Sequence, residues 1–145
     1  MVRRSAPASK PVMEVKIESQ FREPTAFERA LLARLLEANF PGKSELAALL
    51  RDVLVRTIDE GGGLQLESRI NGQAPVVKRV PVEAEGKDED GAIVHMLLHV
   101  DEGRPVELEF FREDAVTVKV IPHPTNFEVI VMPPAPKDGW ASNNH

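Results

Sequence analysis

Apolar and polar residues alternate along the chain between residues 90 and 120. Successive side chains of a β-strand point to opposite faces, so each run of alternating apolar residues predicts one strand with one buried face. The three runs are Val94, Met96, Leu98 and Val100; Val106, Leu108 and Phe110; and Val116, Val118 and Val120. The pattern therefore predicts three consecutive antiparallel strands, which together form a β-meander.

The register of the first hairpin follows from matching its apolar faces. The matched pairs are Val94 with Phe110, Met96 with Leu108, and Leu98 with Val106. This leaves Asp101-Glu102-Gly103 as a three-residue loop, with glycine in the left-handed last position. In this register His95 faces Glu109. The same matching across a turn at 112–114 pairs Leu108 with Val118, Phe110 with Val116, and Glu107 with Lys119.

Alternation with the period of a strand also occurs outside the meander. Residues 13–18 predict a short strand at a sheet edge, because their second face is charged. Residues 64–70 and 75–84 predict a hairpin around the Asn71-Gly72 turn, and residues 127–131 predict a last strand.

Helical spacing of apolar residues is confined to the first part of the chain. Thr25 and Glu28 form a capping-box signature, and the apolar stripe behind them predicts a helix that ends after Phe40. Ser44 can cap a second helix whose stripe reaches Ile58. The predicted fold class is α+β, with this N-terminal helical hairpin packed on one face of a five- or six-stranded, mainly antiparallel sheet.

The length of 145 residues predicts one domain with flexible ends. We expect a disordered N-terminal segment at 1–11, a single α+β domain at 12–132 and a Pro-rich flexible tail at 133–145. The sequence has no cysteine, which suits a reducing compartment, and its net charge of −5 argues against a nucleic-acid-binding surface. No apolar run approaches the roughly 20 residues of a membrane span, so a soluble, cytoplasmic protein is predicted.

The sequence contains no catalytic signature. Walker, Gly-x-Ser-x-Gly and His-Glu-x-x-His sequences do not occur, so we expect no enzyme activity, metal or cofactor. His95 and His99 share one strand face but are about 13 Å apart, too far to bind one metal ion together. Asp88-Glu89-Asp90-Gly91 fails the ligand spacing of a calcium loop and is expected to form a turn.

The polar side of the meander places apolar and charged side chains together on an outer face. Helices on one side of the sheet cannot cover this face, and its mixed composition is typical of protein–protein contacts. The predicted binding surface comprises His95, Leu97, Glu107, Glu109, Phe111, Lys119 and Ile130. The acidic loops at 85–91 and 101–102 are expected to border this surface.

Several short motifs follow one another in a fixed order along residues 22–121. They are Arg22-Glu23-Pro24-Thr25 before the helical pair, the Gly61-Gly62 turn, Asp90-Gly91, Asp101-Glu102-Gly103 and Glu107-Leu108-Glu109. This arrangement resembles a family of small bacterial α+β domains of unknown function. The resemblance implies no active site that could be carried over. By analogy, small acidic α+β proteins of this kind act as immunity or adaptor proteins.

The leading functional hypothesis is a non-catalytic protein that binds another protein as an immunity, inhibitor or adaptor protein. The alternative is a small-ligand-binding protein or an enzyme with a site around His95, His99 and Glu109. A structural homodimer that buries the outer face is a third hypothesis. A concave pocket beside His95 would favour the ligand-binding hypothesis.

Overall fold

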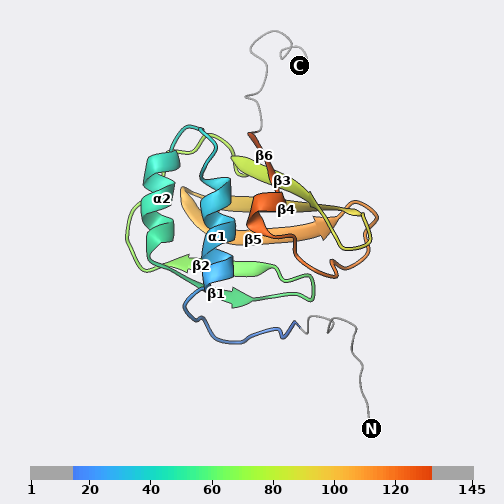
Figure 1. Cartoon of the computed structure of the whole chain (residues 1–145). Helices are drawn as coiled ribbons and strands as arrows, with labels where there is room; N and C mark the ends of the chain where they lie inside the picture. The colour runs from blue at the N-terminus through green and yellow to red at the C-terminus, as the bar shows by residue number, and fades with distance from the viewer. Residues whose placement is uncertain (1–14, 132–145) are drawn as a thin grey trace, which may run out of the picture.

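A computed structural model of the chain describes residues 15–131 (Figure 1). Its elements are α1 (Ala26–Leu35), α2 (Lys43–Arg51), β1 (Val53–Thr57), β2 (Leu64–Ser68), β3 (Val82–Lys87), β4 (Ile93–Asp101), β5 (Arg104–Arg112), the 3-10 helix η2 (Pro124–Asn126) and β6 (Glu128–Val131). Two α-helices precede a six-stranded antiparallel sheet, so the predicted α+β class is confirmed. The segments predicted to be disordered at 1–11 and flexible at 133–145 lie outside the described residues. No helix in the described part is long and apolar enough to cross a membrane.

Helix α1 begins where the capping box predicts. The Thr25 hydroxyl accepts a hydrogen bond from the Glu28 amide at 3.1 Å, and the Glu28 carboxylate accepts one from the Thr25 amide at 2.9 Å. The helix ends at Leu35 rather than Phe40, because the backbone then tightens into a shorter turn in which the Ala38 amide donates to the Leu35 carbonyl.

Helix α2 ends at Arg51, well before the predicted end at Ile58. The chain passes almost directly into β1, where Val53, Val55 and Thr57 are buried with the period of a strand. These three residues are β-branched, and pairing with β2 buries their shared face, so strand geometry prevails over helical spacing.

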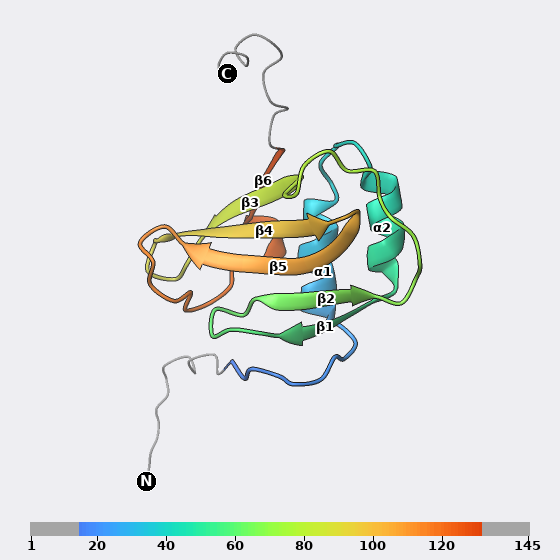
Figure 2. The ribbon, with the colours of Figure 1, turned by 180° about the vertical axis from the view of Figure 1, so that it is seen from behind.

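The strand order is β1-β2-β5-β4-β3-β6, so the continuous meander comprises β3, β4 and β5. The predicted hairpin of residues 64–70 with 75–84 is wrong, because β2 and β3 are not neighbours in the sheet. Residues 69–81 instead connect distant parts of the sheet (Figure 2). This connection contacts the β4–β5 turn, where the Ala74 amide donates to the Gly103 carbonyl at 2.8 Å.

The hairpin of β4 and β5 keeps most of the predicted faces but not the predicted register. The observed pairs include Met96 with Phe110 and Leu98 with Leu108, a shift of two residues along β5 that leaves these side chains on their original face. Val106, predicted to face inward, is only half-buried, and the neighbouring Pro105 is buried instead. The register changes again at a bulge between His99 and Val100. Glu102 and Gly103, with φ of 51° and 78°, form a two-residue turn instead of the predicted three-residue loop.

The third strand of the predicted meander does not form. The amides of Lys119 and Val120, which would have joined the sheet, donate to the buried Asp88 carboxylate at 2.7 and 2.9 Å. Arg112 donates to the same carboxylate at 3.1 Å, and its side chain is only 4% exposed. A loop held by a buried ion pair therefore replaces the strand, and the predicted pairing of Glu107 with Lys119 is wrong.

The N-terminal segment follows the edge of the sheet without forming the predicted strand. Residues 15–18 are not in a strand, and Met13 lies outside the described residues. Arg22 forms an isolated bridge with Val55, and its guanidinium donates to Glu18 at 2.9 Å and to Glu28 at 2.8 Å. These bonds tie the segment to both β1 and α1.

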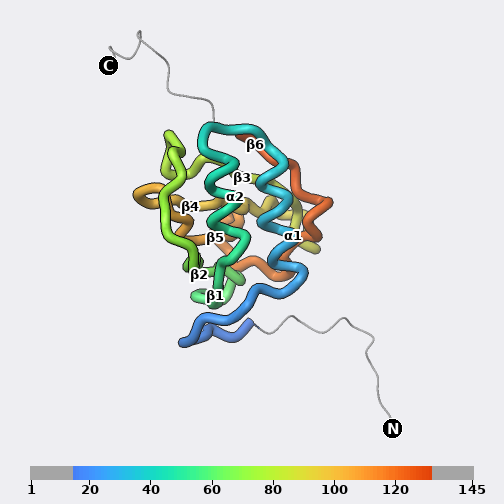
Figure 3. Tube along the Cα trace, turned by 90° about the vertical axis from the view of Figure 1, so that its left-hand side faces the viewer, coloured from blue at the N-terminus to red at the C-terminus, as the bar shows by residue number. Residues whose placement is uncertain are grey.

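Both helices lie side by side on one side of the sheet (Figures 1 and 3). The view from behind shows the sheet in front of them (Figure 2). Leucines of both helices and the inward-facing residues of the strands form one buried hydrophobic cluster. The opposite face of the sheet has no covering helix among the described residues.

Replacing Asp88 with Asn should lower the free energy of unfolding by about 2–4 kcal/mol, because an amide cannot accept from every surrounding donor and Arg112 loses the buried carboxylate that faces it. Burial alone would raise the pKa of Asp88, but hydrogen bonds from backbone amides and Arg112 hold it below its ordinary value of 3.8. The charged carboxylate therefore stabilises the fold above pH 3.8, and this contribution is lost as the pH falls through the lowered pKa.

Urea denaturation followed by circular dichroism, at neutral and at acidic pH, measures this effect. The variant should differ most from the wild type at neutral pH. Glu89→Gln is the matched control, because Glu89 is exposed in the same turn and its replacement should change stability by less than about 0.5 kcal/mol. Equal losses for both variants would show that the buried carboxylate is not a principal support of the fold.

Candidate functional site

The outer face consists of the side chains of β3–β6 that point away from the helices. Its members are Glu83, Glu85 and Lys87 on β3, Ile93, His95, Leu97 and His99 on β4, Glu107, Glu109 and Phe111 on β5, and Glu128 and Ile130 on β6. Strand pairing brings them into rows across the sheet. Leu97 lies between Glu83 and Glu109, and in the next row His95 lies between Glu85 and Phe111.

Carboxylates dominate this face. Together with Glu113 just beyond β5, it has six glutamates: Glu83, Glu85, Glu107, Glu109, Glu113 and Glu128. Within residues 15–131, the ion pairs of these glutamates involve His95 and His99 but no lysine or arginine. Phe111 is 40% exposed, and Leu97 and Ile130 are partly exposed. The face is therefore anionic, with accessible apolar groups among its charges.

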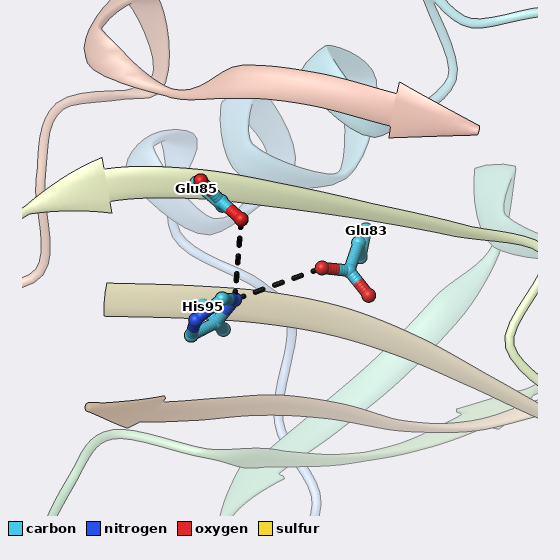
Figure 4. A group of neighbouring side chains, drawn as sticks. All are labelled: Glu83, Glu85 and His95. Atoms are coloured by element: carbon cyan, nitrogen blue, oxygen red, sulfur yellow. Dashed lines mark ion pairs between the residues drawn. The ribbon is translucent and has the colours of Figure 1, made fainter. Parts of the chain in front are cut away.

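Three carboxylates surround His95. Its Nδ1 atom lies 3.6 Å from Glu83 and 3.9 Å from Glu85 (Figure 4), while its Nε2 atom lies 2.9 Å from Glu113. The ring stacks on Phe111 with centroids 4.8 Å apart, and the side chain is only 12% exposed. These contacts fix the orientation of the ring and direct both of its nitrogen atoms toward carboxylates.

His99 has a separate carboxylate partner, Glu109, at 2.7 Å from its Nε2 atom. The prediction that Glu109 faces His95 is wrong, because the shift in register places Phe111 opposite His95. Glu113 takes the position beside the His95 ring. The structure therefore divides the predicted grouping of His95, His99 and Glu109 into two neighbouring histidine–carboxylate pairs.

Lys119 is the predicted surface residue that the structure places elsewhere. It lies in the loop after β5, with its ammonium group 3.6 Å from Asp90 rather than opposite Glu107. The predicted acidic loop at 85–91 is also shorter than expected, because residues 85–87 belong to β3 and the Asp88 side chain is buried. The charge of the outer face therefore comes mainly from strand residues.

The sequence interpretation missed Glu83 and Glu85 as members of this face. Val82, Ala84 and Gly86 are buried and alternate with them, so the signal of a strand was present in the sequence. The predicted strand at 75–84 began too early and ended before Glu85, which assigned the second glutamate to a loop.

Several hollows adjoin the sheet, and two of them lie beside the outer face and on the helix side. One of about 400 Å³ is lined by residues that include Glu85, Lys87, Ile93 and Glu128, at the β3–β6 side of the outer face. The other, of about 360 Å³, lies on the helix side and has mainly apolar walls that include Phe27, Leu31, Leu64, Phe110 and Ile121. His95 lines neither of these two hollows, whereas Glu85 gives the first an acidic wall.

Glu107 lies in crowded surroundings on this face. Burial raises the pKa of Glu107 above its ordinary value of 4.5, and the carboxylates of Glu109 and Asp59 raise it further, while His99 and Arg79 act in the opposite direction. At neutral pH this side chain is therefore charged in surroundings that disfavour its charge.

The fold and this face define an α+β protein with an open, anionic sheet surface. The family model described as "Domain of unknown function (DUF6984)" matches residues 21–122, and the chain belongs to that family. This match confirms the resemblance to a family of unknown function seen over residues 22–121. No curated protein and no solved structure matches the chain significantly.

Replacing Glu107 with Gln should stabilise the protein slightly at pH 7, by less than about 1 kcal/mol, as is usual for partly exposed charges. The raised pKa means that folding favours the neutral acid, so stability decreases as the pH rises through that pKa. Below pH 4.5 the wild-type carboxyl is neutral as well, and the gain should disappear.

Thermal melts of the wild type and Glu107→Gln over this pH range test the expectation. Glu67→Gln is the control, since Glu67 is exposed on β2 and its replacement should have little effect. A Glu107→Gln variant that is less stable than the wild type at pH 7 would contradict the inferred crowding.

Proposed function

We propose that the outer face binds a basic surface of another protein and that the protein acts by binding rather than by catalysis. The observation that supports this proposal is the group of six glutamates whose ion pairs, between residues 15 and 131, include no lysine or arginine. Carboxylates gathered on one face repel one another. Lysine or arginine side chains of a partner would relieve this repulsion and would steer association.

Apolar groups on the same face support a specific contact. Phe111, Leu97 and Ile130 offer partly exposed apolar surface between the charges, and buried aromatic anchors contribute strongly to protein interfaces. The hollow lined by Glu85, Glu128 and Lys87 has two carboxylates against one ammonium group, so its walls carry net negative charge. Charge would then steer the encounter, while the apolar groups would stabilise the complex.

The charge distribution favours a different partner over a second copy of the chain. A two-fold symmetric dimer brings the same patch of both subunits together. Such a contact through the outer face would place glutamates against glutamates, which opposes association. We therefore favour a heteromeric complex over the structural homodimer.

Within this proposal, the protein would block or bridge a basic site of its partner, as an inhibitor, immunity or adaptor protein does. The absence of cysteine from the sequence supports a cytoplasmic setting for this interaction.

Replacing Glu107 and Glu109 together with Lys should weaken partner binding by at least about tenfold, because the reversed charges would repel a basic surface. The wild type and this double variant would serve as baits for affinity capture at about 50 mM and about 300 mM salt, since screening weakens exposed charge contacts. Binding of the purified captured protein to each bait would then be measured by surface plasmon resonance.

Glu45→Lys is the matched control, because it reverses one exposed charge on helix α2, on the opposite side of the sheet. We expect the control to bind like the wild type and all three proteins to melt at similar temperatures. Equal binding by the double variant and the wild type would contradict the proposal. So would the absence of any protein that the wild type retains more than the double variant.

A further inference from the structure

We propose that Glu83, Glu85 and His95 form a binding site for a divalent transition-metal ion, with Zn²⁺ as the best-matched ion. This inference goes beyond protein binding and does not depend on it. Two ligands come from alternate positions of β3, so they share one face, and the third comes from the paired strand β4 (Figure 4). The site thus lies on two hydrogen-bonded strands rather than on a loop.

The distances between the candidate ligand atoms suit one small ion. All three atoms lie within 4.8 Å of one another, and His95 Nδ1 is 3.6 Å from Glu83 and 3.9 Å from Glu85. Zinc bonds of about 2.0–2.2 Å in a tetrahedral arrangement place neighbouring ligand atoms roughly 3.3–3.6 Å apart. Small rotations of the two flexible glutamate side chains would therefore be enough to close the site around an ion.

The ligand atoms, one imidazole nitrogen and two carboxylate oxygens, favour zinc over calcium and magnesium. One imidazole nitrogen with two carboxylate oxygens is a ligand set that zinc accepts readily, usually with water at the fourth position. Calcium and magnesium prefer sites built entirely from oxygen atoms. The Glu83 and Glu85 side chains are 18% and 39% exposed, so an ion and its water could reach them from solvent.

Glu113 and Phe111 would position the histidine without binding the ion. His95 Nε2 lies 2.9 Å from the Glu113 carboxylate, and if Nε2 carries the proton, Nδ1 is free to bind a metal. A carboxylate behind a metal-binding histidine in this way is a recurrent feature of zinc sites. Stacking on Phe111 holds the ring in place.

The charges at the site also favour a cation. Two carboxylates share this corner of the sheet, and their ion pairs within the described residues are with His95. A neutral imidazole leaves both negative charges uncompensated, whereas a divalent ion would balance them.

Calorimetric titration of the metal-stripped full chain with zinc chloride tests the proposal. We expect one zinc ion per chain at this site and at least about tenfold weaker binding for Glu83→Gln and for His95→Gln. Glu113→Gln should weaken binding by about tenfold, as expected for a residue that positions a ligand. Glu67→Gln, an exposed glutamate on β2 that is not part of the cluster, should bind like the wild type.

Nitrogen NMR of the histidine side chains in the wild type provides a readout that does not depend on variant folding. Zinc should shift the Nδ1 resonance of His95 and leave the ring of His99 much less affected. The proposal would be overturned by zinc that does not perturb His95, by variants that bind as tightly as the wild type, or by the absence of binding.

Discussion

The buried contact between Asp88 and Arg112 determines how the chain crosses from β5 to β6. Asp88 follows β3 and Arg112 ends β5, and the same carboxylate also holds the amides of the loop after β5. The loop can therefore not add to the sheet as a continuation of the meander. The chain instead passes through η2 to the far edge, where β6 pairs with β3. Because β3 then lies between β4 and β6, Glu83 and Glu85 occupy an interior strand beside His95 rather than a sheet edge.

The outer face follows from this arrangement and from the position of the helices. Helices on one side leave the other side of β3–β6 without a helical cover among the described residues (Figure 2). Strand pairing then fixes where its charges lie, because glutamates of β3, β5 and β6 meet across the sheet. The same glutamates support two separate proposals: a basic protein partner over the whole face, and a metal ion at one corner. Both rest on carboxylates whose ion pairs, among residues 15–131, are with His95 and His99.

Features that depend on neighbouring residues, such as a helix cap or the alternation along a strand, could be predicted from the sequence. The capping box located the start of α1, and alternation along β4 and β5 identified the faces of most side chains, including most of the predicted binding surface. Alternation could not determine the register, since a shift of two residues preserves the faces. Residues 53–58 satisfied both helical and strand spacing, and pairing with β2 decided between them. Val116–Val120 also alternated, but a carboxylate distant in sequence took the amides that a strand would have used.

The most direct test of an open, anionic outer face is a map of the electrostatic potential along the backbone. Amide relaxation would be recorded by NMR with a cationic and with an anionic nitroxide of similar shape in solution. We predict that amides of β3, β4 and β5 near the outer face are strongly relaxed by the cationic probe and much less by the anionic one. Equal relaxation by both probes, or protection of these strands from both, would contradict an open anionic face.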